Sequence, residues 1–355
     1  MLKSLKIENF RCFQNFELQQ LGKLNLLVGT NNSGKTSILE AVQLLTSQAN
    51  LMSLQEVMIG RGEYVNDELG NGRELDVRHL FYGHEIDIGS RFSILDGTHN
   101  GKEGITVSIE HTGQLNLFED LKELVLAIEW LGQEKGDIKL PLSPQEGLPL
   151  DYIKRIRRDF KNAGVKTQFV TSSSLTTQQM TELFDQVVLT PEEELVTESL
   201  QTIEPSIDRI ASIGSEKLSY SSSHSGFVVR LNRTDQRIPI GSMGDGIWRM
   251  LGLTLAIVNA RNGVLLVDEI DAGLHFSAMS DMWRLIWETA KRLNVQVFAT
   301  THNSDCWTSL AAIASRESPS EEGITIQRIE KDKPNSIVFT ERQVIIAAER
   351  GIEVR

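Results

Sequence analysis

The stretch LLVGTNNSGKTSILEAV, residues 26–42, contains the element around which the fold is built. It fits the pattern G-x-x-x-x-G-K-[ST] through Gly29, Gly34, Lys35 and Thr36. An apolar, strand-like segment precedes the pattern and a helix-like segment at 35–46 follows it, which is the context that a phosphate-binding loop requires. A chance glycine loop would not need these flanks. The stretch therefore predicts a strand, a loop and a helix that together bind phosphate.

The predicted loop has the residue types that nucleotide binding needs. Glycines let backbone N–H groups turn towards phosphate oxygens, and the following helix adds the positive end of its dipole. We expect Lys35 to neutralise the β- and γ-phosphates of ATP, and Thr36 to place its hydroxyl on Mg²⁺. The residues expected to hold the nucleotide are Gly29, Asn31, Asn32, Ser33, Gly34, Lys35, Thr36 and Ser37.

A second strand ends in two acids. In GVLLVDEID, residues 263–271, the apolar run Val264–Val267 is typical of a buried strand in a parallel sheet. Asp268 and Glu269 follow it directly. We expect Asp268 to join the Mg²⁺ shell and Glu269 to orient or deprotonate the attacking water. A solvated acidic turn is the alternative interpretation of the two acids.

Another strand-like segment, VQVFATTHN at 295–303, ends in polar residues that should reach the same edge of the sheet. This would place His302 where it contacts the γ-phosphate or the attacking water. We therefore group His302 with Glu269 and Lys35 as candidate catalytic residues. On spacing alone, a capped loop residue is the alternative for this histidine.

A second glycine-rich helix start, IPIGSMGDGIWRML, occupies residues 238–251. Ser242 offers a hydroxyl, Gly244 permits close approach of another backbone, and the helix that begins near Gly246 favours an anion at its start. By itself the element equally fits a helix whose N-cap is Ser242.

Taken together and in this order, the phosphate loop, GSMGDG, LLVDEIDAGLH and FATTH resemble the ATPase head of ABC-type proteins of the SMC, RecF and OLD group. FRCF at 10–13 is also similar to that group. The resemblance covers residues 1–110 and 215–310. It implies an α/β fold of the ABC-ATPase head kind, with a mixed β-sheet whose central strands are parallel, an antiparallel β portion and a helical insertion.

In that family the second glycine element is the signature motif, which binds the ATP held by the other subunit. The resemblance implies that Ser242 and Gly244 complete the nucleotide site of a second copy, so that a homodimer buries two ATP molecules. Met243 and Asp245 depart from the usual LSGGQ signature and are similar to the RecF and OLD branch instead.

Further expectations follow from the same resemblance. The segment after Glu269 implies subunit contacts at Asp271, Gly273 and His275. No glutamine fits the family's Q-loop at an obvious strand end. The segment RHLFYGHE at 78–85 lies in the expected region and stays without a role.

Other patterns predict the organisation of the chain. SRFSIL and GITVSIEH predict an antiparallel β portion, LFEDLKELVLAIEWL at 117–131 predicts a helix, and further helices are expected at 246–260 and 276–293. We expect an N-terminal ATPase lobe at 1–115, a helical insertion at 116–212 and a C-terminal ATPase lobe at 213–355.

Composition limits the class of protein. The net charge of −12 argues against a protein that coats nucleic acid through its overall field. Cys12 and Cys306 form no CxxC pair, so that neither a disulfide framework nor a zinc site is suggested, and a reducing cytoplasm fits. We expect no leader peptide and no membrane span.

One helix in the predicted insertion is basic. In DYIKRIRRDFKNAG, helical spacing puts Lys154, Arg157, Arg158 and Lys161 on one face, which suits a nucleic-acid backbone or an acidic partner. A solvated helix face is the alternative.

The leading hypothesis is an ATP-binding and ATP-hydrolysing dimeric switch. Only about fifty residues follow TTHNSDC, too few for the nuclease domain of OLD proteins, and no long heptad insertion is present. The resemblance therefore implies the ATPase or sensor subunit of a bacterial anti-phage defence system, controlling a separate nuclease or toxin. The alternatives are a RecF-like DNA repair ATPase and a nucleotide-dependent scaffold that does not hydrolyse. A transporter ATPase and a small-molecule kinase fit the signature element less well.

Overall fold

A computed structural model describes residues 1–48, 51–66, 73–97, 103–111, 124–132, 138–156, 164–213, 226–232, 236–316 and 323–354, with the side chains of 154–156 left aside. Contacts divide the chain into two compact units. Unit 1 comprises Met1–Leu21, Asn32–Val165 and Ile329–Ile337, and unit 2 comprises Gly22–Asn31, Lys166–Arg328 and Val338–Arg355.

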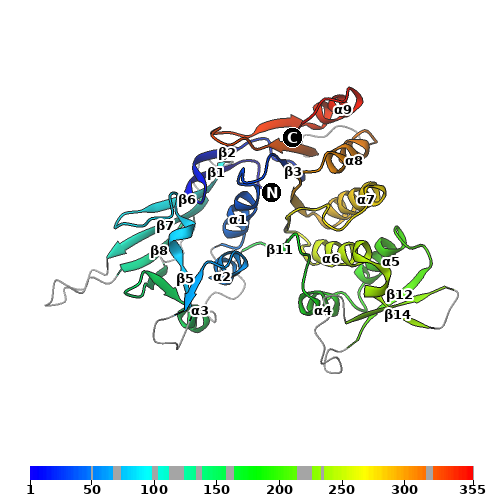
Figure 1. Ribbon diagram of the computed structural model, residues 1–355, viewed down its shortest axis with the longest axis horizontal. Coiled ribbons are helices and arrows are strands. Elements are labelled where there is room, and N and C mark those ends of the chain that lie inside the picture. Colours follow the sequence, from blue (N-terminus) through cyan, green and yellow to red (C-terminus); the bar gives the residue numbers. More distant parts are fainter. Residues whose placement is uncertain are drawn as a thin grey trace. The chain divides into compact units, whose positions relative to one another are not determined.

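Unit 1 is built on an antiparallel sheet of six strands in the order β2-β1-β6-β7-β8-β9. These strands are β1 (Leu5–Phe10), β2 (Phe13–Leu18), β6 (Arg91–Asp96), β7 (Glu103–His111), β8 (Leu124–Leu131) and β9 (Ile138–Pro141). A smaller sheet contains β4 (Tyr64–Asn66), β5 (Arg73–Asp76) and β10 (Gly147–Pro149). The helices are α1 (Lys35–Thr46), α2 (Leu51–Gly60), α3 (Leu150–Ile156) and the 3₁₀ turn η1 (Val77–Leu80). Helix α1 packs on β6 and β7 (Figure 1).

The strand β8 corrects a prediction. Residues 124–131 were expected to continue a helix, and they form a strand that pairs with β7 on one side and β9 on the other. Four consecutive residues, Val125–Ile128, are buried, as suits an interior strand. A short apolar run fits a buried helix and a buried strand equally, so the neighbouring strands decide. The first part of the expected helix, 117–123, lies outside the described residues.

Unit 2 is built on a sheet of six strands in the order β11-β15-β16-β3-β17-β18, with parallel pairing from β11 to β17. These strands are β3 (Leu24–Val28), β11 (Thr167–Val170), β15 (Val264–Val267), β16 (Gln296–Thr300), β17 (Ile324–Arg328) and β18 (Ile337–Thr340). Every residue of β3, β15 and β16 is buried. Because these strands are parallel, their carboxyl ends reach one edge of the sheet, where ligands bind in open α/β folds.

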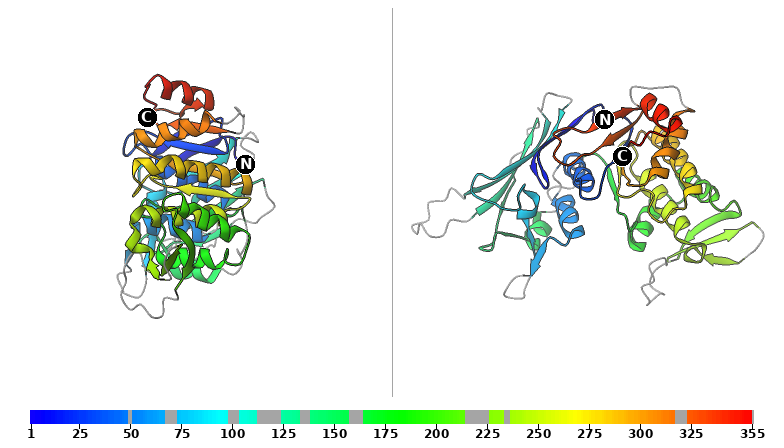
Figure 2. Two further views of the ribbon diagram at one scale, coloured as in Figure 1. Left: turned by 90° about the vertical axis from the view of Figure 1, so that its right-hand side faces the viewer. Right: turned by 45° about the horizontal axis from the view of Figure 1, so that its top comes forward.

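Helices and a small antiparallel sheet complete unit 2. The helices are α4 (Thr177–Asp185), α5 (Glu192–Gln201), α6 (Asp245–Asn259), α7 (Phe276–Leu293), α8 (Ser304–Ala314) and α9 (Glu341–Glu349), with the 3₁₀ turn η4 at Ile240–Met243. The small sheet contains β12 (Ile207–Ser212), β13 (Phe227–Leu231) and β14 (Arg237–Pro239). Figure 1 and the left view of Figure 2 show α6, α7 and α8 side by side.

The core of unit 2 explains why α6 is apolar all round. Its buried residues continue from Ile247 to Asn259, because α4, α5, α7 and β11 all pack against it. Trp283 and Trp287 of α7 are buried, and the Trp283 Nε1 donates a hydrogen bond to the Cys306 carbonyl at 2.9 Å. The expected insertion contributes to both units, since α3 belongs to unit 1 and α4 and α5 belong to unit 2.

Candidate functional site

The phosphate loop has the backbone that its sequence predicted. Strand β3 ends at Val28 and α1 begins at Lys35, with Gly34 as the N-cap residue at φ 95°. A Cβ atom on Gly34 would lie 2.3 Å from the Phe13 ring and 2.8 Å from the Cys12 Sγ. Positive φ and this close contact both require glycine. The first N–H groups of α1 have no acceptor within the helix, so the loop ends in an anion-binding position.

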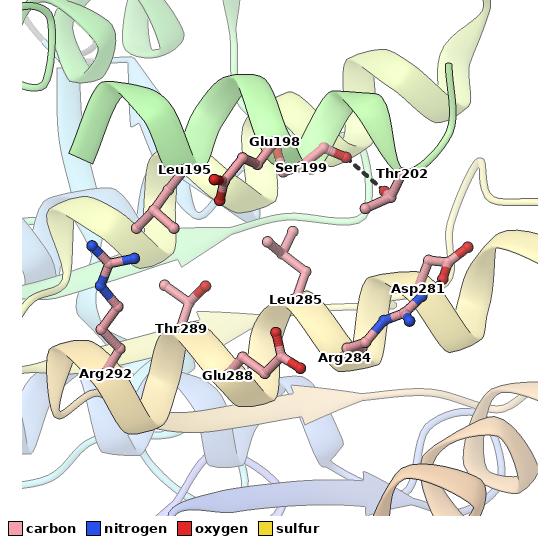
Figure 3. A pocket seen from close by; sticks show the side chains of 10 residues that line it. All are labelled: Leu195, Glu198, Ser199, Thr202, Asp281, Arg284, Leu285, Glu288, Thr289 and Arg292. Carbon is pink, nitrogen blue, oxygen red and sulfur yellow. Dashed lines mark hydrogen bonds and ion pairs between the residues drawn. The ribbon is translucent and has the colours of Figure 1, made fainter. Parts of the chain in front are cut away.

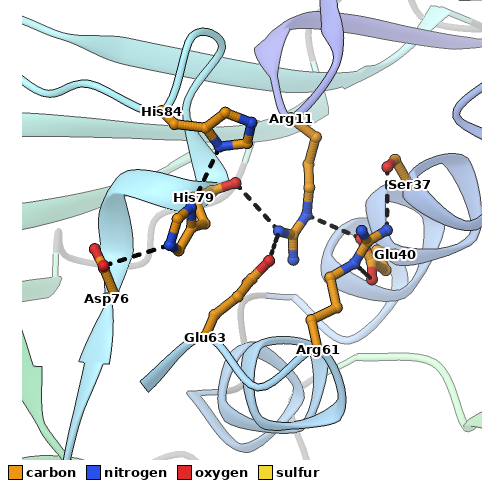
Figure 4. Close-up of polar contacts among 8 residues, drawn as sticks. All are labelled: Arg11, Ser37, Glu40, Arg61, Glu63, Asp76, His79 and His84. Carbon is orange, nitrogen blue, oxygen red and sulfur yellow. Dashed lines mark hydrogen bonds and ion pairs between the residues drawn. The ribbon is translucent and has the colours of Figure 1, made fainter. Parts of the chain in front are cut away.

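A buried ion cluster holds α1 within unit 1 (Figure 4). The Arg11 side chain is 4% exposed, and its Nε lies 2.9 Å from the Glu40 Oε2 on the inner face of α1. Arg11 also pairs with Glu63, and the Arg61 Nε lies 2.5 Å from the Glu40 Oε1. Burial raises the pKa of Glu40, and the charges of Arg11 and Arg61 oppose that rise. The cluster therefore depends on all of its partners.

The cluster reaches the nucleotide loop through Ser37. The Arg61 Nη2 donates a hydrogen bond to the Ser37 Oγ at 3.2 Å, in the first turn of α1. FRCF was noted only as a family resemblance, and neither Glu40 nor Arg61 was predicted as a site residue. The paired residues of the cluster lie 21 to 52 positions apart in the sequence, so no local sequence pattern could predict their contacts.

Polar groups gather where β15 and β16 end. The Thr300 Oγ1 donates to the Asp268 Oδ1 at 2.6 Å, and the Glu269 backbone N–H donates to the Thr300 Oγ1 at 2.8 Å. Glu269 itself has φ 46°, an uncommon conformation for a residue other than glycine. Thr300 thus fixes both acids relative to the sheet.

The predicted catalytic pair lies together at this edge. The His302 Nδ1 is 3.9 Å from the Glu269 Oε1, and their side chains are 54% and 46% exposed. Asp271 accepts a hydrogen bond from the Thr301 Oγ1 at 2.7 Å. Glu269 and His302 are therefore neighbours that solvent reaches, as a site for an incoming water requires.

The second glycine element is an exposed turn before α6. Ser242, in η4, and Gly244 are both exposed, and a Cβ on Gly244 would meet no atom within 4 Å. Gly244, at φ 94°, is the N-cap residue of α6, and no side chain caps the helix. The alternative in which Ser242 caps α6 is therefore wrong.

Arg249 connects α6 to the two acids, and sequence analysis missed it. The side chain is 3% exposed; its Nη1 donates to the Thr171 carbonyl at 2.6 Å, and its Nη2 donates to the carbonyls of Asp268 at 3.1 Å and Glu269 at 2.9 Å. Burial lowers the pKa of Arg249 to about 10, which leaves it charged at neutral pH. The signal was a single arginine inside the apolar helix GIWRMLGL.

The expected subunit-contact positions lie next to the signature turn. The Gly273 carbonyl lies 3.8 Å from the place of a Cβ on Gly246. His275 is the N-cap residue of α7 and accepts a hydrogen bond from the Ser277 backbone N–H at 3.4 Å. Phe276, which follows it, is 62% exposed. The Phe276 ring lies against the His275 ring, with centroids 4.3 Å apart.

Other features lie apart from these residues. Of the predicted basic face, Arg157, Arg158 and Lys161 lie outside the described residues, and only the backbone of Lys154 is described. A cavity of about 300 Å³ lies between α5 and α7, lined by Leu195, Leu285 and charged side chains (Figure 3). Across the described ranges, no helix has both the length and the apolarity needed to cross a bilayer.

Comparison with known proteins gives a family match and a full-length relative that each extend over most of the chain. Residues 24–305 match the family described as "AAA domain, putative AbiEii toxin, Type IV TA system". The chain is also 22% identical over 336 residues to a Helicobacter pylori protein named ATP/GTP phosphatase. The aligned region covers 86% of this chain and 86% of that protein.

Other similarities are local or structural. A Thermus scotoductus OLD nuclease is 49% identical over 45 residues, 13% of this chain and 8% of that protein, and a RecF protein of Thermomicrobium roseum is 38% identical over 71 residues, 20% of this chain and 17% of that protein. An Smc head domain from Pyrococcus furiosus, solved with an extended coiled coil and bound to the C-terminal domain of ScpA, has a TM-score of 0.50 at 9% identity over 99% of both chains. These findings confirm the predicted fold class and the resemblance to ABC-type ATPases of the SMC, RecF and OLD group.

The ion cluster generates a stability prediction. In Arg11→Met, two buried carboxylates lose a partner, and we expect the free energy of opening around α1 to fall by about 3–5 kcal/mol. Arg230→Met is the control, because Arg230 is 55% exposed in its pair with Asp208 and should contribute about 1 kcal/mol or less. Amide hydrogen exchange of α1 and of β13 measures both. Similar effects of the two substitutions would contradict a supporting role for the cluster.

A second prediction concerns Arg249. Arg249→Met removes the donor from three backbone carbonyls, those of Thr171, Asp268 and Glu269, which should loosen the backbone at Asp268 and Glu269. We expect ATP turnover to fall about a hundredfold while ATP still binds, because misplacing a catalytic group by about 1 Å has that effect. Arg261→Met is the control, since Arg261 is 59% exposed in its pair with Glu192. Steady-state phosphate release and equilibrium nucleotide binding separate the two effects, and unchanged turnover in Arg249→Met would show the clamp to be dispensable.

Proposed function

We propose that this chain, which belongs to the AAA-domain family matched by its residues 24–305, is an ATP-hydrolysing switch. Its two nucleotide sites would each be completed between two copies of the chain. The observation that carries the proposal is the link in unit 2 between the exposed start of α6 and the acids after β15. Arg249 makes that link through the carbonyls of Asp268 and Glu269.

Each residue of the loop has a chemical role in this proposal. The N–H groups around Asn31 to Gly34 and at the start of α1 hold the phosphates, and Lys35 neutralises the charge on the β- and γ-phosphates. Ser37 lies in the same first turn and is held by Arg61. The fixed loop binds the triphosphate in one orientation, which raises the rate by positioning alone.

The remaining roles are the binding of Mg²⁺ and the activation of water. The hydroxyl of Thr36 and the carboxylate of Asp268 are the hard oxygen donors that Mg²⁺ prefers, and Mg²⁺ would neutralise charge on the phosphates. Glu269 orients the water and accepts its proton, and the neighbouring His302 contacts the γ-phosphate or the same water. The exposure of both side chains lets water enter before a second copy closes over them.

The second copy supplies the signature turn. Ser242 and Gly244 are exposed, and the start of α6 has no capping side chain, so an incoming γ-phosphate meets a hydroxyl, an open backbone and the helix dipole. Asp271, Gly273, His275 and the exposed Phe276 then lie within the contact between copies. Binding of phosphate at α6 would be transmitted by Arg249 to Glu269 of the same chain.

The switch acts on something other than itself. The name of the matching family mentions a toxin, and this name supports a defence system in which an ATPase acts with a separate nuclease or toxin. We therefore propose control of a separate effector in a bacterial anti-phage system. Expression with its genomic neighbour and recovery of an ATP-dependent complex tests that proposal.

A RecF-like role in DNA repair is the second candidate, because RecF proteins are among the local matches. It would use the predicted basic face at Lys154, Arg157, Arg158 and Lys161. ATP-dependent retention of DNA by the purified chain, weakening steeply with salt, would favour repair over defence. A scaffold that does not hydrolyse would release phosphate no faster than the buffer.

The proposal predicts a trapped dimer. In Glu269→Gln, ATP binding should persist and phosphate release should fall by about a hundredfold or more, because the general base is lost. Unhydrolysed ATP should then hold two copies together in mass photometry. Glu129→Gln, on the exposed side of β8, is the matched control and should leave both turnover and assembly unchanged. A variant that is saturated with ATP and still monomeric would exclude the composite site.

A further inference from the structure

A pair of histidines lies in the segment RHLFYGHE, to which neither the sequence nor the proposed function gave a role. His79 belongs to η1, directly after β5, and His84 lies in the loop that follows. The His79 Nδ1 and the His84 Nδ1 are 3.3 Å apart, with ring centroids at 5.3 Å (Figure 4). Both residues belong to unit 1; His84 is exposed, and the side chain of His79 is 40% exposed.

The separation of the two nitrogens fits a shared cation. A tetrahedral Zn²⁺ with Zn–N bonds of about 2.05 Å places two nitrogen ligands about 3.3 Å apart. The same distance allows a hydrogen bond between the two rings when no metal is bound. The spacing of the pair is therefore compatible with two ligands of one metal without a change of the backbone.

Asp76 prepares His79 for this role. The His79 Nε2 lies 3.4 Å from the Asp76 Oδ2, and Arg78 holds the same carboxylate through two hydrogen bonds of 2.8 Å. The Asp76 carboxylate thus lies beside the ring nitrogen of His79 that is not the one facing His84, which is the place of the outer carboxylate in carboxylate–histidine–metal arrangements.

The backbone holds both rings in place. Gly83 at φ 86° and His84 at φ 61° turn the chain, and the His84 N–H donates to the Phe81 carbonyl at 3.2 Å. Histidine is among the residues that adopt this left-handed conformation more readily than most side chains. On the other side, the His79 carbonyl accepts a hydrogen bond from the Arg11 Nη1 at 3.1 Å, which ties η1 to the buried ion cluster. The pair is thus held at its spacing by contacts that do not involve a metal.

We propose that His79 and His84 form a binding site for a borderline divalent transition metal such as Zn²⁺ or Cu²⁺, with Asp76 as the outer partner of His79. Water completes the coordination, because no group of three or more His, Cys, Asp or Glu in the described ranges is arranged to hold a metal. Imidazole donors select Cu²⁺ and Zn²⁺ over Mg²⁺, so this site is distinct in chemistry from the proposed nucleotide site.

The test is metal binding by the full chain without nucleotide. Zn²⁺ is titrated calorimetrically in the presence of excess Mg²⁺, so that Mg²⁺ occupies the sites that consist of oxygen ligands. We expect one Zn²⁺ site, tighter binding of Cu²⁺ than of Zn²⁺, and a visible absorption band of tetrahedral type with Co²⁺. Binding of no Zn²⁺ at all, or binding that Mg²⁺ abolishes, would overturn the proposal.

The variants locate the metal. His79→Ala and His84→Asn should each remove the titrated site, and asparagine is chosen because it tolerates the left-handed backbone at position 84. Asp76→Asn should weaken Zn²⁺ binding about tenfold, the usual effect of losing an outer partner. His111→Ala, at the end of β7, is the matched control. Equal Zn²⁺ affinity in wild type, His79→Ala and His84→Asn would place the metal elsewhere, and circular dichroism checks that each variant is folded.

Discussion

The guanidinium of Arg249 is the contact on which the proposed switch depends. It is a buried charge that donates to three backbone carbonyls, and two of these belong to the proposed magnesium ligand and the proposed base. A buried charge is stable only when its hydrogen bonds are satisfied, so α6 and the segment at 268–269 cannot move independently without leaving it unpaired. An event at the exposed start of α6 therefore has a direct route to Asp268 and Glu269, the proposed catalytic acids.

The parallel sheet of unit 2 supplies the second constraint. Parallel pairing brings the ends of β3, β15 and β16 to one edge, so the start of the phosphate loop, the acids and His302 emerge together. The Thr300 hydroxyl then fixes both acids, because it accepts a hydrogen bond from the Glu269 backbone N–H and donates one to the Asp268 carboxylate. In unit 1 the Arg11–Glu40–Arg61 cluster fixes α1 in a similar way. The charges of this cluster would destabilise the fold if their partners were removed.

Much of this was predictable because the motifs are local. The helices at 35–46 and 276–293 have their predicted bounds, and the strands before the phosphate loop and before the acids were expected. The residues that join these motifs were missed, since Arg249, Glu40 and Arg61 act through partners far away in the sequence. The strand β8 was mistaken for a helix because its apolar run has no period that distinguishes the two. The pairing of His79 with His84 was not expected, because no local motif detects two histidines that a left-handed turn brings together.

The most direct test of the composite site mixes two inactive variants. Lys35→Ala removes the phosphate lysine, and Ser242→Arg blocks the exposed signature turn. In a mixed dimer, one site contains both lesions and the other contains neither. We predict that each variant alone hydrolyses no ATP and that an equal mixture recovers about a quarter of the wild-type rate per chain, since half the dimers are mixed and each has one intact site of two. No recovery, although mixed dimers form, would mean that each chain completes its own site and would contradict the account.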